Sequence, residues 1–372
     1  MQLLPSLFVD VQKSFEGDFL NSPENIVDPS TAIAVTGCDG FLGKYLVTAL
    51  KRRFRIIELT KRPCSEMEHD NRRVRVQCDI RIDESVSDAV NRIGAIARVE
   101  AVIHLAAVKR YWLPENVFYE TNTQGTRRMI WAARQLGVRQ FVFLSTSLIY
   151  AKRKNAYSTS KARAERLVRD AQLPYTILRF TPLFGEGDDS NITRLVEFVG
   201  KNRLIPIVPL IGSGKQKIQP LFVQDAVAAV EAVLLREEHF NKEYNLSGFD
   251  TNLRDIAAMA TPDCERGKLV LGIPLRLARL TARICAKMLD CPVLTIQQLD
   301  SLDEEVSFDS SAAWTRLGVK RTPLGEAISM LICRNGRPNL RSGRPPNPIP
   351  PVHVNRKSVT RAEAIEDPFT LL

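Results

Sequence analysis

A short apolar run followed at once by three evenly spaced glycines constrains the fold of this chain more than any other feature. The run is Thr31–Thr36, and Gly37, Gly40 and Gly43 follow it at intervals of three residues. Glycines allow a tight turn, a close approach of backbone N–H groups to an anion, and close packing of a helix on a strand. The pattern therefore predicts a strand, a phosphate-binding turn and a helix that ends near Arg53.

The segments that follow alternate between apolar strands and amphipathic helices. We expect strands at 55–59, 74–78, 101–107, 140–144, 174–180 and 243–246, and helices at 120–136 and from Tyr157 onward. This alternation is typical of a parallel sheet with helices on both faces. The predicted fold class is therefore α/β, a Rossmann-type doubly wound parallel sheet with a small, mainly helical C-terminal substrate lobe.

Shifts in composition and regularity suggest the domain boundaries. Residues 1–30 are a polar N-terminal extension, and residues 31–181 form the dinucleotide-binding core, which also receives 219–248. Residues 182–218 and 249–333 are assigned to the substrate lobe, because the regular alternation stops there. Residues 334–372 are basic, rich in proline and without periodicity, which predicts a disordered tail.

Composition excludes several classes of protein. The 372 residues are 44% hydrophobic and 25% charged, and no apolar run reaches the length of about 18 residues that an integral membrane segment needs. The N-terminus lacks the basic start of a signal peptide, and the seven cysteines are scattered, which predicts reduced thiols, a cytoplasmic location and no metal site. The net charge of +10 includes no basic stripe interleaved with aromatic residues, so no nucleic-acid partner is predicted.

One basic amphipathic segment has two interpretations. Residues 274–290 carry an apolar stripe, with Arg276, Arg279, Arg283 and Lys287 along another face. The segment is either a helix of the lobe with a solvated basic face or a helix that touches a membrane surface.

A hydroxyl, a phenol and an amine lie at spacings in the sequence that are suited to proton transfer. Tyr157 and Lys161 are four residues apart and so share one face of a helix, and Thr146 lies at the end of the preceding strand. A nearby ammonium favours the phenolate, and a second hydroxyl can bind the same reacting oxygen. These three residues are the predicted catalytic group for moving a proton while a hydride moves at the adjacent carbon.

Other residues at strand ends are candidates for cofactor contacts. Thr60 occupies the place where an NAD site usually has a carboxylate, and Lys61 and Arg62 follow it, so NADP(H) is preferred over NAD(H). Asp79 and Ile80 follow the third strand, where an adenine edge is often held, and the small residues after His104 leave room for a cofactor. His104 itself is expected to be a core histidine, and Asp225 a structural acid at a helix start.

The order of these motifs resembles the extended short-chain dehydrogenase/reductases, the NAD-dependent epimerase/dehydratase family. The matching stretches include TGCDGFLG (36–43), HLAAV (104–108), FLSTSLIYA (143–151), YSTSK (157–161) and GSGKQKIQPLFVQDAV (212–227). The resemblance covers about residues 31–332. It implies that Thr146, Tyr157 and Lys161 are catalytic, and that Asn122 shapes the neighbouring helix and its proton path.

The resemblance also implies which residues bind the dinucleotide. The implied contacts are Gly37, Asp39, Gly40, Phe41, Leu42, Gly43, Lys61, Arg62, Asp79, Ile80, Leu105, Ala106, Ala107, Tyr157 and Lys161. The family usually has an acid after the second strand, which this sequence lacks, and dehydratases add an acid pair that Ser145-Thr146-Ser147 does not provide.

The predicted function is that of an NAD(P)-dependent ketoreductase or epimerase acting at a sugar-ring carbon, C4, of a nucleotide sugar, in a homodimer. Cations considered for the substrate diphosphate are Lys215, Lys217, Arg179 and Arg194. Two alternatives remain: a hydroxysteroid-type or other carbonyl reductase of the same superfamily, and a non-catalytic NAD(P)H-binding accessory protein. Tyr157 and Lys161 count against the accessory protein, because such relatives typically lack this pair.

Overall fold

The structure is a computed structural model, and it describes residues 31–64, 68–70, 72–110, 112–201, 207–261, 269–288, 299 and 307–335. The predicted extension at 1–30 and the tail from 336 onward lie outside the described residues. Among the described residues, no helix is long and apolar enough to cross a membrane. No group of three or more metal-ligating side chains occurs among them either.

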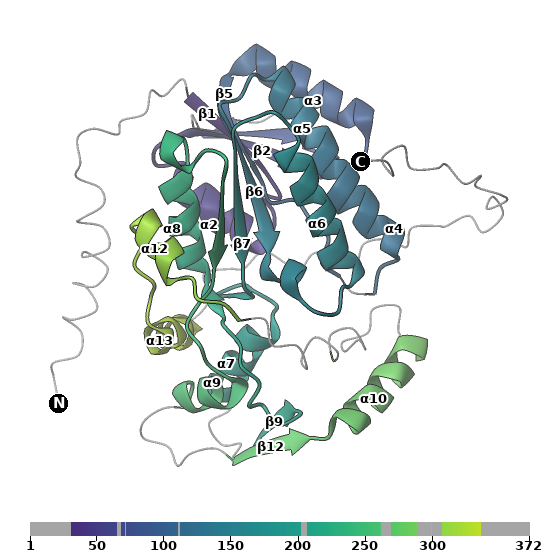
Figure 1. Cartoon of the computed structure of the whole chain (residues 1–372), viewed down its shortest axis with the longest axis vertical. Helices are drawn as coiled ribbons and strands as arrows, with labels where there is room; N and C mark the ends of the chain where they lie inside the picture. The colour runs from purple at the N-terminus through teal and green to yellow at the C-terminus, as the bar shows by residue number, and fades with distance from the viewer. Residues whose placement is uncertain are drawn as a thin grey trace. The chain divides into compact units, whose positions relative to one another are not determined.

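A central sheet organises the molecule (Figure 1). Its strand order is β11-β7-β6-β5-β1-β2-β4-β3, and every neighbouring pair is parallel except β3 with β4. The order reverses direction beside β1, as in doubly wound folds. The strands are β1 (Thr31–Thr36), β2 (Arg55–Thr60), β3 (Glu68–Asp70), β4 (Arg73–Gln77), β5 (Arg98–His104), β6 (Gln140–Thr146), β7 (Tyr175–Phe180) and β11 (Lys242–Leu246).

Helices cover both faces of this sheet (Figure 1). One face packs against α2 (Phe41–Leu50), α8 (Val223–Val233) and α12 (Ser311–Leu317). The other packs against α3 (Asp83–Ile96), α5 (Gly125–Gln135) and α6 (Ala156–Arg169). Strands β1 and β6 are buried almost throughout, because a parallel sheet sandwiched between helices has no solvated face. The predicted Rossmann-type fold is confirmed.

A second apolar cluster forms the lobe. It joins α7 (Asn191–Lys201), α9 (Leu253–Met259) and α13 (Leu324–Asn335) with short strands. The strands form two parallel pairs: β8 (Leu183–Phe184) with β10 (Leu221–Phe222), and β9 (Ile207–Ile211) with β12 (Leu269–Ile273). Helix α10 (Leu275–Met288) follows β12. The division of the chain into core and lobe domains at the predicted residues stays a prediction.

The predicted helix at 120–136 is confirmed, but its first part is not α-helical. A short helix α4 (Glu115–Phe118) leads into a π-helical segment, Tyr119–Gln124, and only then does α5 begin. π-Helical turns are rare and occur mostly at functional sites. Because Asn122 lies in this segment, the irregularity belongs to the candidate site.

Candidate active site

The glycine loop is packed so tightly that side chains would not fit. A Cβ on Gly37, whose φ is +70°, would lie 2.8 Å from the backbone nitrogen of Ala106, and a Cβ on Gly43 would lie 2.2 Å from the Gly37 carbonyl oxygen. No side chain caps the N-terminus of α2, which begins directly after Gly40. The backbone N–H groups of this first turn are therefore suited to an anion such as a pyrophosphate. Gly37, Gly40 and Gly43, with Phe41 and Leu42, lie together in this turn, and their binding of a pyrophosphate stays a prediction.

A carboxylate lies at the end of β2 after all, and it comes from the glycine loop. Asp39 accepts a hydrogen bond from the Thr60 hydroxyl at 2.6 Å and another from Arg75 at 2.8 Å, and the Arg62 Nε lies 3.8 Å away. Partial burial raises the pKa of Asp39, but the Thr60 hydrogen bond and the two arginine charges outweigh it and hold the pKa below its usual value. The sequence is correct that β2 itself does not end in an acid. It did not show that Asp39 of the glycine loop lies at this strand end.

The other acid near this strand end serves a different purpose. Glu58 is fully buried on β2 and binds Arg73 and Arg75. Both arginines come from β4, so Glu58 joins the two strands and is not free for a ribose. Arg75 connects Glu58 to Asp39, which makes one partly buried polar chain along the sheet.

The adenine side of the expected site is formed by the segment after β4. Asp79 accepts two hydrogen bonds from the Arg81 side chain, at 3.0 and 2.6 Å, and these bonds lower its pKa. Ile80 is buried, and a Cβ on Gly125 would meet it at 2.7 Å. Sequence reasoning missed Arg81, which holds the Asp79 carboxylate in place.

The small residues after β5 lie beside the glycine loop. Leu105, Ala106 and Ala107 follow the strand and remain partly open to solvent. The backbone N–H of Ala106 donates to the Thr36 hydroxyl at 3.1 Å, which joins the ends of β5 and β1. The two chain segments that should flank a dinucleotide therefore lie side by side.

His104 is the core histidine that the sequence predicts. Its two ring nitrogens lie 2.7 Å from the Thr36 hydroxyl and 3.1 Å from the Thr126 hydroxyl. Burial, with the nearby Lys161 charge, lowers the pKa of His104 to about 3. It is neutral at working pH and ties β5 to its neighbours.

Asn122 joins three segments around the site. Its side chain accepts from the Val108 N–H at 2.7 Å and donates to the Val108 carbonyl at 3.0 Å. Its amide nitrogen also lies 2.9 Å from the Ser160 hydroxyl, on α6. Asn122 thus holds α6 against the loop after β5, which makes it a positioning residue.

Tyr157 is placed by a capping box at the start of α6. The Asn155 side chain accepts from the Ser158 N–H at 2.8 Å, and the Ser158 hydroxyl lies 3.0 Å from the Asn155 N–H. These two bonds fix the first turn of the helix, which carries the half-buried Tyr157. The sequence analysis missed this box, although asparagine three residues before serine is a readable signal.

Lys161 is buried one turn further along the same helix. Its Nζ donates to the Leu144 carbonyl on β6 and lies 3.9 Å from the centre of the Phe143 ring. Burial lowers the pKa of Lys161 to about 7, with Glu165 opposing the shift. The ammonium is therefore held against the strand that ends in Thr146.

This contact fixes where α6 lies along β6. α6 follows β6 and returns along the sheet, so moving back four helix residues from Lys161 advances about 6 Å toward the end of β6. Moving from Leu144 to Thr146 advances about 6.6 Å along the strand. Thr146 is the last residue of β6, and its hydroxyl also accepts from the Leu148 N–H at 3.3 Å. The catalytic roles of Thr146, Tyr157 and Lys161 stay predictions.

Lys161 should make stability depend on pH. Its folded pKa lies below the unfolded value, so between about pH 7 and pH 10 the unfolded chain binds more protons and stability rises with pH, by up to about 1.4 kcal/mol per pH unit. Below pH 7, Lys161 is charged in both the folded and the unfolded chain, so the full cost of burying its charge lowers the stability of the fold. Lys161→Met should remove this contribution, so that the stability difference from wild type is largest at pH 6 and shrinks toward pH 9.

Urea unfolding at pH 6, 7, 8 and 9 measures this dependence. Lys215→Met serves as the control, because Lys215 is exposed in a turn. A constant difference between Lys161→Met and wild type across these pH values would show that Lys161 does not titrate in this range.

Two of the cations considered for a substrate diphosphate are already engaged. Arg179 is buried, donates to Glu165 at 2.8 and 2.7 Å and also binds Glu243. Lys217 lies 2.8 Å from Asp250. Arg179 is therefore a structural residue between α6, β7 and β11, and its prediction as a diphosphate ligand is wrong. Lys215 and Arg194 are exposed, and their role stays a prediction.

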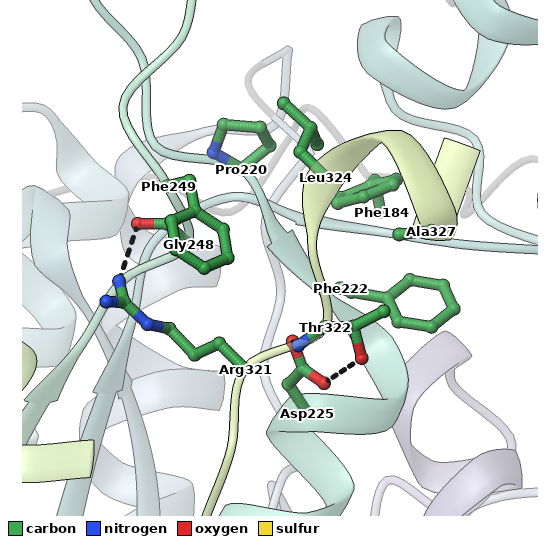
Figure 2. A pocket seen from close by; sticks show the side chains of 10 residues that line it. All are labelled: Phe184, Pro220, Phe222, Asp225, Gly248, Phe249, Arg321, Thr322, Leu324 and Ala327. Carbon is green, nitrogen blue, oxygen red and sulfur yellow. Dashed lines mark hydrogen bonds between the residues drawn. The ribbon is translucent and has the colours of Figure 1, made fainter. Parts of the chain in front are cut away.

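A small pocket lies where α8 meets the loop before α13, as Figure 2 shows. It is lined mainly by apolar side chains, with Asp225 and Arg321 at its polar side. Asp225 accepts from the Thr322 hydroxyl at 2.6 Å and from its N–H at 3.0 Å, so it connects two parts of the chain that are far apart in sequence. Burial raises the pKa of Asp225, and the two bonds oppose that shift. The structural role predicted for Asp225 is confirmed.

Known proteins resemble the chain in sequence and in fold. One relative is N-acetyl-alpha-D-glucosaminyl-diphospho-ditrans,octacis-undecaprenol 4-epimerase of Escherichia coli O157:H7. The two sequences are 24% identical over 246 residues, and the match covers 61% of this chain and 70% of that protein. It is 22% identical to the mitochondrial NADH-ubiquinone oxidoreductase 40 kDa subunit of Neurospora crassa, over 77% of this chain and 74% of that protein. Both matches thus leave part of the relative's length uncovered.

A solved structure shows the same fold. UDP-glucuronic acid 4-epimerase from Bacillus cereus, in complex with UDP-glucuronic acid and NAD, superposes with a TM-score of 0.62 at 18% identity, covering 82% of this chain and 99% of that one. The model of the NAD dependent epimerase/dehydratase family matches residues 33–247, from the first strand to the last strand of the central sheet. With its glycine loop, strand-end threonine and Tyr157–Lys161 helix on that sheet, the chain belongs to the NAD-dependent epimerase/dehydratase family.

Proposed function

We propose that this protein is an NAD(P)-dependent epimerase or ketoreductase that acts at a sugar-ring carbon, C4, of a nucleotide sugar. The observation that carries the proposal is the Lys161 contact with Leu144, because it holds the helix that carries Tyr157 against the strand that ends in Thr146. The relatives and structural neighbours include a 4-epimerase of a lipid-linked sugar and a structure that contains a UDP-sugar and NAD. These similarities support the class of substrate.

Each residue of the group has a distinct task in this proposal. Tyr157 exchanges a proton with the reacting oxygen, and the Thr146 hydroxyl donates a hydrogen bond to that oxygen. Lys161 supplies the positive charge that favours the phenolate, and Asn122 keeps α6 in position. The nicotinamide, when bound, supplies or accepts the hydride. The glycine cradle at α2 holds the pyrophosphate of the dinucleotide.

A substrate screen tests the proposal. UDP-, GDP- and dTDP-sugars are incubated with the full chain and with NAD(H) or NADP(H), and the products are identified by mass spectrometry and chromatography. Isomerisation without a mass change identifies an epimerase, and a gain of two hydrogens identifies a ketoreductase. Tight NADH or NADPH binding without turnover of any nucleotide sugar would overturn the proposal.

Two other functions remain as outcomes of the same screen. Hydroxysteroid and other carbonyl substrates are included, because they need the same proton donor and differ only in the lobe. The similarity to a subunit of the mitochondrial oxidoreductase favours a non-catalytic accessory protein, whereas the presence of Thr146, Tyr157 and Lys161 in the sequence favours an enzyme.

Asp39 decides the choice of dinucleotide in this proposal. The stretch Thr60-Lys61-Arg62 predicts NADP(H), and Arg62 is 61% exposed at its side chain. Asp39, however, lies at the same strand end and keeps its negative charge. A carboxylate can accept further hydrogen bonds from ribose hydroxyls, whereas it repels a 2′-phosphate. We therefore favour NAD(H), while the NADP(H) preference stays a prediction of the sequence.

Asp39→Asn should shift binding toward NADPH by about tenfold, the size of a charged hydrogen bond worth about 1.5 kcal/mol. The amide keeps the shape of the side chain and a bond to Thr60, but it loses the charge. NADH and NADPH titrations by fluorescence measure both affinities, and Asp88→Asn on the exposed side of α3 is the control. Tighter binding of NADPH than NADH by the wild type would contradict this assignment.

Two broader predictions belong to the proposal. A homodimer through two long helices is expected from the family, and gel filtration with light scattering measures it. A cytoplasmic location is expected from the cysteine pattern, and three cysteines of the described residues, Cys38, Cys64 and Cys78, form no disulfide.

A further inference from the structure

The lobe carries an apolar surface that faces solvent. On the β9–β12 pair, Ile207 pairs with Leu269 and Pro209 with Leu271, so these four side chains share one face of the pair. Ile207, Leu269 and Leu271 are 41%, 65% and 54% exposed, while Val208 and Leu210, on the opposite face, are buried in the lobe. The outer face of this pair is therefore apolar, and Ile207, Leu269 and Leu271 face solvent in the part of the chain that the structure describes.

Helix α10 follows β12 directly (Figure 1). Its inner side, with Ala278 and Ala282, packs against Ile211, which lies on the same face of β9 as Ile207. Its other side presents Leu277 and Leu280, which are 52% and 53% exposed. Large exposed apolar patches on soluble domains mark interaction sites.

A positive stripe borders these leucines. At about 100° per residue, Arg276, Arg279 and Arg283 occupy the sector between the buried alanines and the exposed leucines. Arg276 and Arg283 are exposed and Arg279 is half-buried. The sequence of α10, LRLARLTARICAKM, contains no acidic residue. An apolar stripe bordered by arginines is typical of a helix that lies in the interface of a membrane.

We propose that this face, formed by Ile207, Leu269, Leu271, Leu277 and Leu280 with Arg276 and Arg283, docks the protein on the surface of an anionic lipid bilayer. The leucines enter the boundary between headgroups and acyl chains, and the arginines bind lipid phosphates. Each arginine near such a surface strengthens binding by about fivefold. A second copy of the chain is a poorer occupant, because a two-fold contact would bring two positive stripes together.

Sedimentation with vesicles tests the proposal on the full chain. We expect binding to phosphatidylglycerol–phosphatidylcholine vesicles, weak binding to phosphatidylcholine alone, and a decrease when salt rises from 50 to about 500 mM. Leu277→Ser with Leu280→Ser, and separately Arg276→Gln with Arg283→Gln, should each weaken binding at least about tenfold, the equivalent of about 1.4 kcal/mol.

Matched pairs of substitutions elsewhere provide the controls. Ile82→Ser with Ile96→Ser removes exposed apolar side chains near α3, and Arg127→Gln with Arg166→Gln removes exposed charges from α5 and α6. Both control pairs should bind vesicles as the wild type does. Unchanged binding by the leucine pair would overturn the proposal. So would a dimer in light scattering that the leucine pair converts to monomer, because a second copy would then cover the face. Neither result depends on nucleotide-sugar turnover.

Discussion

Tyr157→Phe should reduce turnover by about 10²–10⁴-fold, because it removes the proton that the phenol exchanges with the substrate oxygen. The ring stays in the first turn of α6, and the Asn155–Ser158 capping box does not depend on the hydroxyl. The fold and the dinucleotide affinity should therefore change little. Steady-state kinetics on the substrate found in the screen, with NADH titration and a thermal melt, separates these effects.

Tyr175→Phe is the matched control for this substitution. Tyr175 is also half-buried, but it begins β7 and lies outside the catalytic group. Removing the Tyr175 hydroxyl should leave turnover within about twofold of the wild-type value. Full activity of Tyr157→Phe would remove Tyr157 from the chemistry, and equal losses in both variants would attribute the effect to the fold.

The order of elements in the core could be predicted from the sequence because each signal was local. β1 agrees with the prediction at both ends, since an apolar run stops at Gly37, where φ is positive. β6 extends two residues further than predicted, to Thr146, and all of its residues are buried. Thr146 thus lies on the strand itself, which fixes its backbone more firmly than a loop would.

Contacts between distant segments could not be predicted in the same way. Asp39 and Thr60 are separated by 21 residues, and Asp39 and Arg75 by 36, so no spacing rule joins them. The sequence showed that β2 is not followed by an acid. It did not show that Asp39 lies at the end of this strand. The prediction of Arg179 as a diphosphate ligand was wrong for a similar reason. Only the register of β7 with β11 brings Glu243 near Arg179.

The lobe was the least predictable part. The strands β9 and β12 pair across more than 50 residues, and the sequence analysis predicted neither five-residue segment as a strand. The pairing explains why alternate residues of β9 are buried while Ile207 is exposed. The basic face of the 274–290 segment could be predicted, but the exposure of Leu277 and Leu280 beside it could not, because it depends on how α10 packs.

Gly43→Ala should disrupt both folding and dinucleotide binding, because the new Cβ would lie 2.2 Å from the Gly37 carbonyl oxygen and 2.8 Å from the Cys38 Cα. Both are backbone atoms, so no flexible side chain can move aside. We expect a loss of stability of about 1–3 kcal/mol or more, and a displaced turn that binds NADH at least about tenfold more weakly.

Gly94→Ala is the control, and it should change the stability in the opposite direction. Gly94 lies within α3, and a Cβ there would meet nothing within 4 Å. Replacing a helical glycine by alanine should stabilise the chain by about 0.5–1 kcal/mol and leave NADH binding unchanged. Urea unfolding and NADH titration of both variants give the comparison. If Gly43→Ala kept the stability and NADH affinity of the wild type, the loop would not be packed as tightly as the Gly37 and Gly43 contacts require, and its role as the pyrophosphate cradle would fail.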